Sequence, residues 1–107
     1  MLDIHLGRSK ESAAKTAPRF QLEETLHAKL FAGTDFNGAK YQKITKIKDY
    51  YSDASFLPEE LPELIKELDE ILNRLSSDAP FTKALQTFRS ICETALQADE
   101  TLFCFAD

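Results

Sequence analysis

Two stretches in the second half of the chain carry the clearest pattern of apolar and polar positions. Apolar side chains recur every three or four residues from Leu61 to Leu75, and again from Phe81 to Leu96, as on one face of an amphipathic helix. Pro58 suits a first helical turn, and the polar residues 76–78 with Pro80 suit a short connection. We therefore expect two helices that pack as an antiparallel hairpin. The two stripes consist of Leu61, Leu64, Ile65, Leu68, Ile71, Leu72 and Leu75, and of Phe81, Leu85, Phe88, Ile91, Cys92, Ala95 and Leu96.

The two ends of the chain show a different period. Residues 1–6 alternate apolar and polar side chains, and residues 101–107 place successive side chains on opposite faces, as in β-strands. Chain termini are often close together in a domain, so we expect these strands to pair, in a direction that the pattern leaves open. In the second strand Leu102, Cys104 and Ala106 would share one face, and Phe103 and Phe105 the other.

Two weaker helical patterns lie between these regions. The first begins at Phe20 and ends near Gly33, and the second covers residues 40–51. The sequence FNGA at residues 36–39 predicts a turn between them, because Asn and Gly tolerate positive φ angles. The apolar positions are Leu22, Leu26 and Leu30 in the first helix, and Tyr41, Ile44, Ile47 and Tyr51 in the second.

Residues 7–19 contain no large apolar side chain and combine Gly, Ser, Lys and Pro, so we expect a mobile loop there. The 107 residues then form a single domain, 1–107, of the mainly α (α+β) class. It would contain about four helices, with the hairpin at the C-terminal end, and a small two-stranded sheet made by the N- and C-terminal strands.

Charge is distributed unevenly along the chain. The net charge is −5, but residues 1–52 hold nine basic and six acidic residues, whereas residues 53–107 hold four basic and twelve acidic ones. Such a surface favours a basic partner and disfavours nucleic acid, although Lys40, Lys43, Lys46 and Lys48 form one basic cluster. No apolar run approaches the roughly 20 residues that cross a bilayer, so we expect no membrane insertion and a cytoplasmic location.

The two cysteines indicate the redox state. Cys92 and Cys104 both lie in apolar segments and no secretory signal precedes them, so we expect free thiols in a reducing compartment. A zinc site is not expected, because no Cys-x-x-Cys pair or histidine cluster exists.

The segment KDYYSDASFLPEEL, residues 48–61, gathers the most candidate binding residues. The segment does not match a calcium-binding loop. Tyr51 at the third position cannot bind calcium, and Ala54 stands at the sixth position, where the sharp turn requires Gly. Paired catalytic carboxylates would need a dry cleft, which the solvated start of a helix does not provide. We therefore expect no catalytic residues, no metal and no cofactor, and interpret the segment as a helix junction with an acidic, tyrosine-bearing surface. The candidate partner-binding residues are Asp49, Tyr50, Tyr51, Asp53, Glu59, Glu60 and Glu63.

His27 supports an alternative hypothesis. It lies four residues after Glu23, a spacing that allows an oriented imidazole, so a small enzyme or ligand binder could use His27 with Glu23 or Asp49 in a pocket between helices. A third hypothesis is an oligomeric scaffold built on the leucine stripe of residues 61–75.

The order of four segments resembles that of small, mostly uncharacterised bacterial proteins, some of which form the immunity side of toxin-immunity pairs. The segments are LHAKLF, YQKITKIKDYYSDASF, LPELIKELDEIL and LFCFAD, within residues 20–107. The resemblance implies a protein that neutralises a partner by covering it, often with acidic residues against a basic toxin site. Together with the charge pattern, it makes a non-enzymatic protein-binding domain for a basic partner the leading hypothesis.

Overall fold

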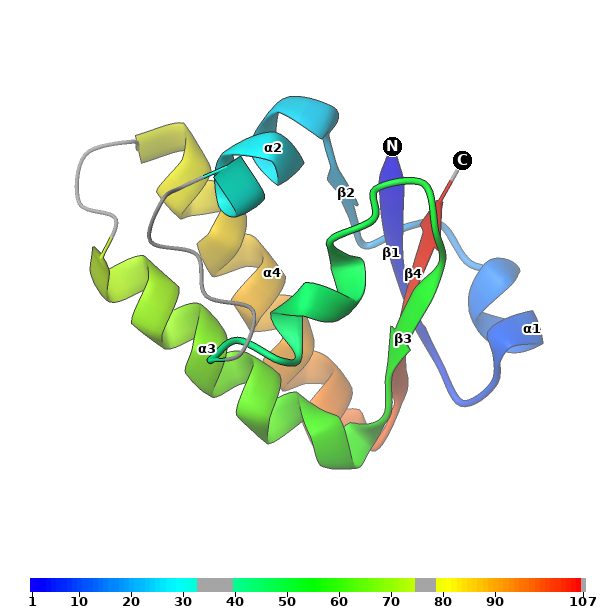
Figure 1. Ribbon diagram of the computed structural model, residues 1–107. Coiled ribbons are helices and arrows are strands. Elements are labelled where there is room, and N and C mark those ends of the chain that lie inside the picture. Colours follow the sequence, from blue (N-terminus) through cyan, green and yellow to red (C-terminus); the bar gives the residue numbers. More distant parts are fainter. Residues whose placement is uncertain (33–39, 75–78, 107) are drawn as a thin grey trace.

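The computed structural model describes residues 1–32, 40–74 and 79–106 of the chain. Helices α2, α3 and α4 cover one face of an antiparallel sheet, and α1 lies on the other face (Figure 1). The expected turn at residues 36–39, the end of a helix at Gly33, the last stripe position Leu75 and the connector at residues 76–78 lie outside the described residues. The elements are β1 (Leu2–Gly7), α1 (Lys10–Ala14), β2 (Phe20–Leu22), α2 (Glu24–Ala32), the 3₁₀ helix η1 (Ile44–Ile47), β3 (Ala54–Phe56), the 3₁₀ helix η2 (Pro58–Glu60), α3 (Leu61–Arg74), α4 (Ala79–Ala98) and β4 (Thr101–Ala106).

The first and last strands pair at the centre of the sheet, which confirms the expected pairing and gives its direction. They run antiparallel, with Leu2 opposite Ala106 and Gly7 opposite Thr101. Within the described residues the sheet has four strands, in the order β2-β1-β4-β3. The expected two-stranded sheet is therefore incomplete, because two short edge strands flank the central pair. The sequence pattern predicts a helix that begins at Phe20, and for the residues of β2 this prediction is wrong. Phe20 and Leu22 instead alternate with the exposed Gln21 and pair with β1.

The core lies between the sheet and the two long helices. Alternate residues of β1 and β4 are buried in it. Helices α3 and α4 lie side by side (Figure 1), and the apolar stripes of both are part of the same core. Arg89 of α4 also pairs with Asp69 of α3. Burial of each large apolar side chain stabilises the fold by roughly 1.5–3 kcal/mol. The largest fully buried side chains are Tyr41, Phe56, Phe88, Leu2, Ile4, Ile44, Ile47, Leu61, Leu64, Leu68, Leu85 and Leu102.

Residues 7–19 contain a short helix where we expected only a loop. The Ser9 side chain caps α1 by accepting the Ser12 N–H, and the Ser12 hydroxyl accepts the Ser9 N–H. Gly7 lets α1 approach the sheet, since a Cβ atom there would stand 2.9 Å from the Ala13 nitrogen. His5 lies beneath this helix, 6% exposed, and its Nδ1 donates to the Ala13 carbonyl at 3.0 Å. Because Gly7 and Ala13 are both small, α1 can pack in close contact with β1.

The helix expected over residues 40–51 is also wrong, because only a 3₁₀ turn at Ile44–Ile47 forms. The carboxylate of Glu67, on α3, accepts the backbone N–H groups of Lys43 at 3.1 Å and Ile44 at 2.9 Å. These two backbone N–H groups therefore bond to a side chain of α3 instead of to carbonyl groups within a helix. Glu67 is 2% exposed, so this buried carboxylate fixes the segment against α3.

The end of α4 directs the chain back into the sheet. Asp99 has a φ of 55°, and the N–H of Glu100 bonds to the Ala95 carbonyl while that of Asp99 bonds to the Leu96 carbonyl. These are the two hydrogen bonds of a Schellman motif, which ends a helix with a sharp reversal. The reversal places β4 beside β1.

Replacement of Glu67 by Ala tests the role of the buried carboxylate. We expect a loss of about 2–4 kcal/mol in the free energy of unfolding, measured by urea denaturation, because two backbone N–H groups lose their acceptor. Glu70→Ala is the matched control on the same helix. Glu70 pairs with Lys40 at the surface, so its loss should cost about 0–1 kcal/mol. Equal losses in the two variants would contradict the assigned role.

Candidate binding surface

The predicted surface centres on a turn at residues 49–53, hereafter the 49–53 turn. The Asp49 carboxylate accepts the Tyr51 N–H at 2.9 Å and the Ser52 hydroxyl at 2.8 Å, the arrangement of an Asx turn. The Tyr51 N–H, followed by the Ser52 hydroxyl, lowers the pKa of the Asp49 carboxyl. Asp49 thus remains charged and held in one orientation at the surface.

The two adjacent tyrosines occupy opposite environments. Tyr50 is 9% exposed, and its hydroxyl donates to the Leu22 carbonyl at 3.1 Å, which attaches the turn to β2. Tyr51 is 74% exposed and forms a T-shaped pair with the Tyr50 ring, with centroids 5.5 Å apart. Of the tyrosine pair predicted as partner-binding, only Tyr51 is therefore presented to solvent, while Tyr50 holds it in place.

The four other predicted residues divide between the two ends of β3. Asp53 lies at the start of β3 and accepts the Ala106 N–H at 2.8 Å, so it joins the 49–53 turn to the end of β4. Glu59 and Glu63 are exposed beyond the other end of the strand. The structure therefore brings Asp49, Tyr51 and Asp53 together and separates the glutamates from them.

Glu60 is engaged within the fold. Its carboxylate accepts the Leu57 N–H at 2.8 Å and forms ion pairs with Lys43 at 3.2 Å and Lys46 at 3.0 Å. Burial acts to raise the pKa of this carboxyl, but the Leu57 N–H and the two ammonium groups outweigh it and lower the pKa to about 2. Two lysines of the predicted basic cluster, Lys43 and Lys46, thus share Glu60 as an ion-pair partner.

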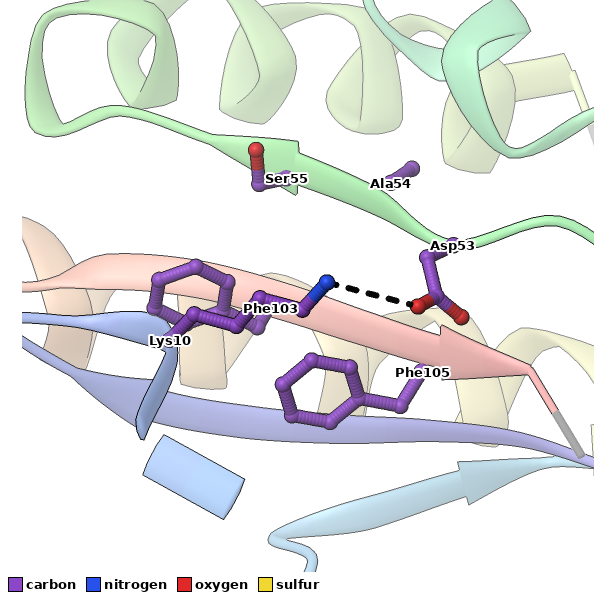
Figure 2. Close-up of a pocket in the computed structure, with 6 residues that line it drawn as sticks. All are labelled: Lys10, Asp53, Ala54, Ser55, Phe103 and Phe105. Carbon is purple, nitrogen blue, oxygen red and sulfur yellow. Dashed lines mark ion pairs between the residues drawn. The ribbon is translucent and has the colours of Figure 1, made fainter. Parts of the chain in front are cut away.

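A pocket of about 240 Å³ opens on the outer face of the sheet beside the 49–53 turn (Figure 2). Phe103 and Phe105 lie side by side along β4, with ring centroids 5.8 Å apart and planes at 9°. Figure 2 shows the Lys10 side chain reaching past Phe103 to Asp53, where Nζ stands 3.8 Å from Oδ2. Ala54 and Ser55 complete the lining. The sequence placed both phenylalanines on one face, but gave no sign that this face stays partly open or that Lys10 and Asp53 meet there.

His27 is engaged inside the fold, which bears on the alternative hypothesis of an enzyme. It is 7% exposed, and its Nε2 donates to the Ile47 carbonyl at 2.6 Å. Its ring contacts those of Phe31 and Tyr50, with centroids 4.8 and 4.9 Å away. The Glu23 side chain is exposed. These contacts give His27 a structural role that joins α2 to the end of η1.

Both cysteines are free thiols in the core, as expected. Burial raises the pKa of Cys92 to about 12 and also raises the pKa of Cys104. A thiolate is the reactive form of cysteine, so neither side chain is suited to nucleophilic chemistry near neutral pH. Within the described residues, no three His, Cys, Asp or Glu side chains are grouped so that they could hold a metal ion. In the same part of the chain, no helix is long and apolar enough to cross a bilayer.

Comparison with known proteins gave no match: no family model, curated protein or solved structure is similar enough to indicate a family. The resemblance to immunity-type proteins therefore stays a prediction.

The low pKa of Glu60 predicts an acid-dependent loss of stability. In the unfolded chain the Glu60 carboxylate is protonated near pH 4.5, whereas in the folded protein it stays charged down to about pH 2. The contribution of Glu60 to the free energy of unfolding is therefore present in full above pH 4.5 and disappears as the pH falls towards 2. We expect Glu60→Gln to lower the free energy of unfolding by about 1–3 kcal/mol at pH 7 and by almost nothing near pH 2. Urea denaturation across this range measures the difference. Glu59→Gln, on the exposed neighbour, is the control, and a pH-independent deficit in Glu60→Gln would contradict the interpretation.

The buried thiols predict a simple chemical result. In the folded protein at pH 8, neither cysteine should react with Ellman's reagent within minutes, whereas both should react at once after unfolding in urea without reductant. Rapid reaction of the native protein would contradict this and reveal an accessible thiol, and the Cys92→Ala variant would show which of the two cysteines reacts. Absence of thiols after unfolding would reveal a disulfide.

Proposed function

We propose that this chain is a non-enzymatic binding domain that covers a basic protein, in the manner of the immunity-type proteins that its sequence resembles. One observation carries the proposal. Tyr51 is 74% exposed and stands between Asp49 and Asp53, two carboxylates oriented by hydrogen bonds to the backbone. An exposed aromatic ring within a fixed acidic rim is suited to a positively charged protein surface.

The rigidity of the 49–53 turn supports this role. Tyrosine supplies a large contact area with few rotatable bonds, and Tyr51 is already held by the ring of Tyr50. Because the turn is joined to β2 through Tyr50 and to β4 through Asp53, little conformational entropy remains to be lost on binding. The acidic second half of the chain would in addition speed encounter with a basic partner.

The alternative, a small enzyme or ligand binder that uses His27, has less support. It requires an imidazole nitrogen that can reach a substrate, whereas Nε2 of His27 is hydrogen-bonded to the Ile47 carbonyl. The pocket beside Asp53 is compatible with ligand binding, but α2, the helix that contains His27, lies on the other face of the sheet (Figure 1).

Photo-crosslinking in the native host tests the proposed function. With a photoreactive phenylalanine derivative in place of Tyr51, we expect one dominant crosslinked protein, of high isoelectric point. The purified partner should then bind the unmodified chain with an affinity that falls steeply with salt, and Tyr51→Ala should weaken this binding by at least about tenfold, as for an interface hot spot.

The matched control carries the same derivative at Gln86, an exposed position on α4. Crosslinks at position 86 that equal those at position 51, or a partner of acidic character, would contradict the proposed function.

A further inference from the structure

We propose that the pocket on the outer face of the sheet binds an arginine side chain of the basic partner, and that Lys10 occupies the cation position until the partner displaces it. This inference rests on the proposed function and specifies what the surface recognises. Three separate elements build the pocket: Lys10 comes from α1, Asp53 and Ser55 from β3 and the residue before it, and two phenylalanines from β4 (Figure 2).

The size of the pocket favours a single side chain. Its volume of about 240 Å³ lies below the roughly 300–1,000 Å³ of pockets that enclose drug-sized ligands. The pocket is open to one side and has an apolar floor, the parallel rings of Phe103 and Phe105. A long side chain with an apolar stem and a polar end matches this shape, with the stem on the rings and the end group at the rim.

The negative charge at the rim of the pocket favours a cationic ligand. Asp53 is held in place because its Oδ1 accepts the Ala106 N–H at 2.8 Å, which leaves Oδ2 directed to the pocket. Asp3 stands directly opposite Phe105 in the strand pairing, so it adds a second negative charge on the same face of the sheet. A cation above Phe105 would interact with the ring face as well as with these carboxylates.

Lys10 already places a cation at the rim, near Asp53, but with poor geometry. Its Nζ is 3.8 Å from Oδ2 of Asp53, beyond the 2.7–3.2 Å of a direct hydrogen bond, and the two side chains are 69% and 50% exposed. Exposed ion pairs of this kind contribute little to stability, so a competitor can replace the lysine easily.

Arginine fits the site better than a second lysine would. The guanidinium group is planar, stacks on aromatic rings, and donates several hydrogen bonds in one plane, whereas an ammonium group is strongly hydrated. Ser55, which lies opposite Phe103 in the strand pairing, adds a hydroxyl group to the lining of the pocket. Lys10 therefore competes with the partner's arginine for Asp53, so removal of the Lys10 side chain should strengthen arginine binding.

The probe is N-acetyl-arginine amide, titrated into the full ¹⁵N-labelled chain at neutral pH and followed by NMR. We expect millimolar binding, with the largest shifts at the amides of Asp53, Ser55, Phe103 and Phe105. The citrulline derivative, which is neutral and has nearly the same shape, should bind at least about tenfold more weakly, and the lysine derivative should also bind more weakly than arginine.

Four variants separate the contributions. Lys10→Ala should tighten arginine binding about two- to fivefold, while Lys15→Ala, an exposed residue at the end of the same helix, should leave it unchanged. Asp53→Asn retains an oxygen for the Ala106 N–H but should weaken binding at least about tenfold, and Phe105→Leu should weaken it about two- to fivefold. The melting temperature of each variant shows whether its fold is intact.

Two results would overturn the inference: no shifts at the pocket even in Lys10→Ala, or equal binding of arginine and citrulline derivatives. If either occurs while Tyr51 still crosslinks to a basic protein, the proposed function stands and only the pocket assignment fails. If arginine binds as expected but Tyr51 yields no basic partner, the pocket is a genuine arginine site and the proposed docking surface is wrong.

Discussion

The pairing of β1 with β4 is the constraint on which the rest of the structure depends. Six residues at the start of the chain and six near its end align in one antiparallel register, and the two edge strands attach on either side. This central pair closes nearly the whole chain into one loop, which costs conformational entropy that the buried faces of both strands must offset. The N-terminal and C-terminal ends of the sequence therefore contribute to a single core.

The same pairing separates core from binding surface. Because side chains alternate along a strand, β4 directs Leu102 and Cys104 to the helices and Phe103 and Phe105 to the opposite face. On that face α1 covers His5 but is only five residues long, which leaves the pocket next to it. The proposed arginine site is thus the part of the outer face that the backbone of the short helix leaves uncovered, with Lys10 of that helix at its rim.

Sequence patterns predicted the parts of the fold that repeat over many residues. The stripes of α3 and α4 and the alternation of the terminal strands were identified because each has several positions in one period. By contrast, β2 and β3 have three residues each, too few to show a period, and α1 is fixed by Gly7 and Ala13, whose small size had suggested a loop. Glu67 also gave no signal, since a buried carboxylate that binds the backbone of a distant segment looks like any other polar position. Within the candidate surface, helical spacing predicted Tyr51 on the apolar face, which is wrong because the helix does not form and Tyr50 is the buried ring. Composition also could not distinguish the lysine-paired Glu60 from the exposed Glu59 and Glu63.

Native-state hydrogen exchange tests the central claim most directly, because it measures the stability of each strand separately. If β1 and β4 form the fixed centre of the sheet, their hydrogen-bonded amides should exchange only by global unfolding, with a free energy of opening equal to that of the whole protein. Amides of α1 and of the edge strands should exchange through smaller, local openings. Exchange of the β4 amides at a free energy well below the global value would mean that the strand detaches on its own, and would contradict a rigid aromatic face prepared for a partner.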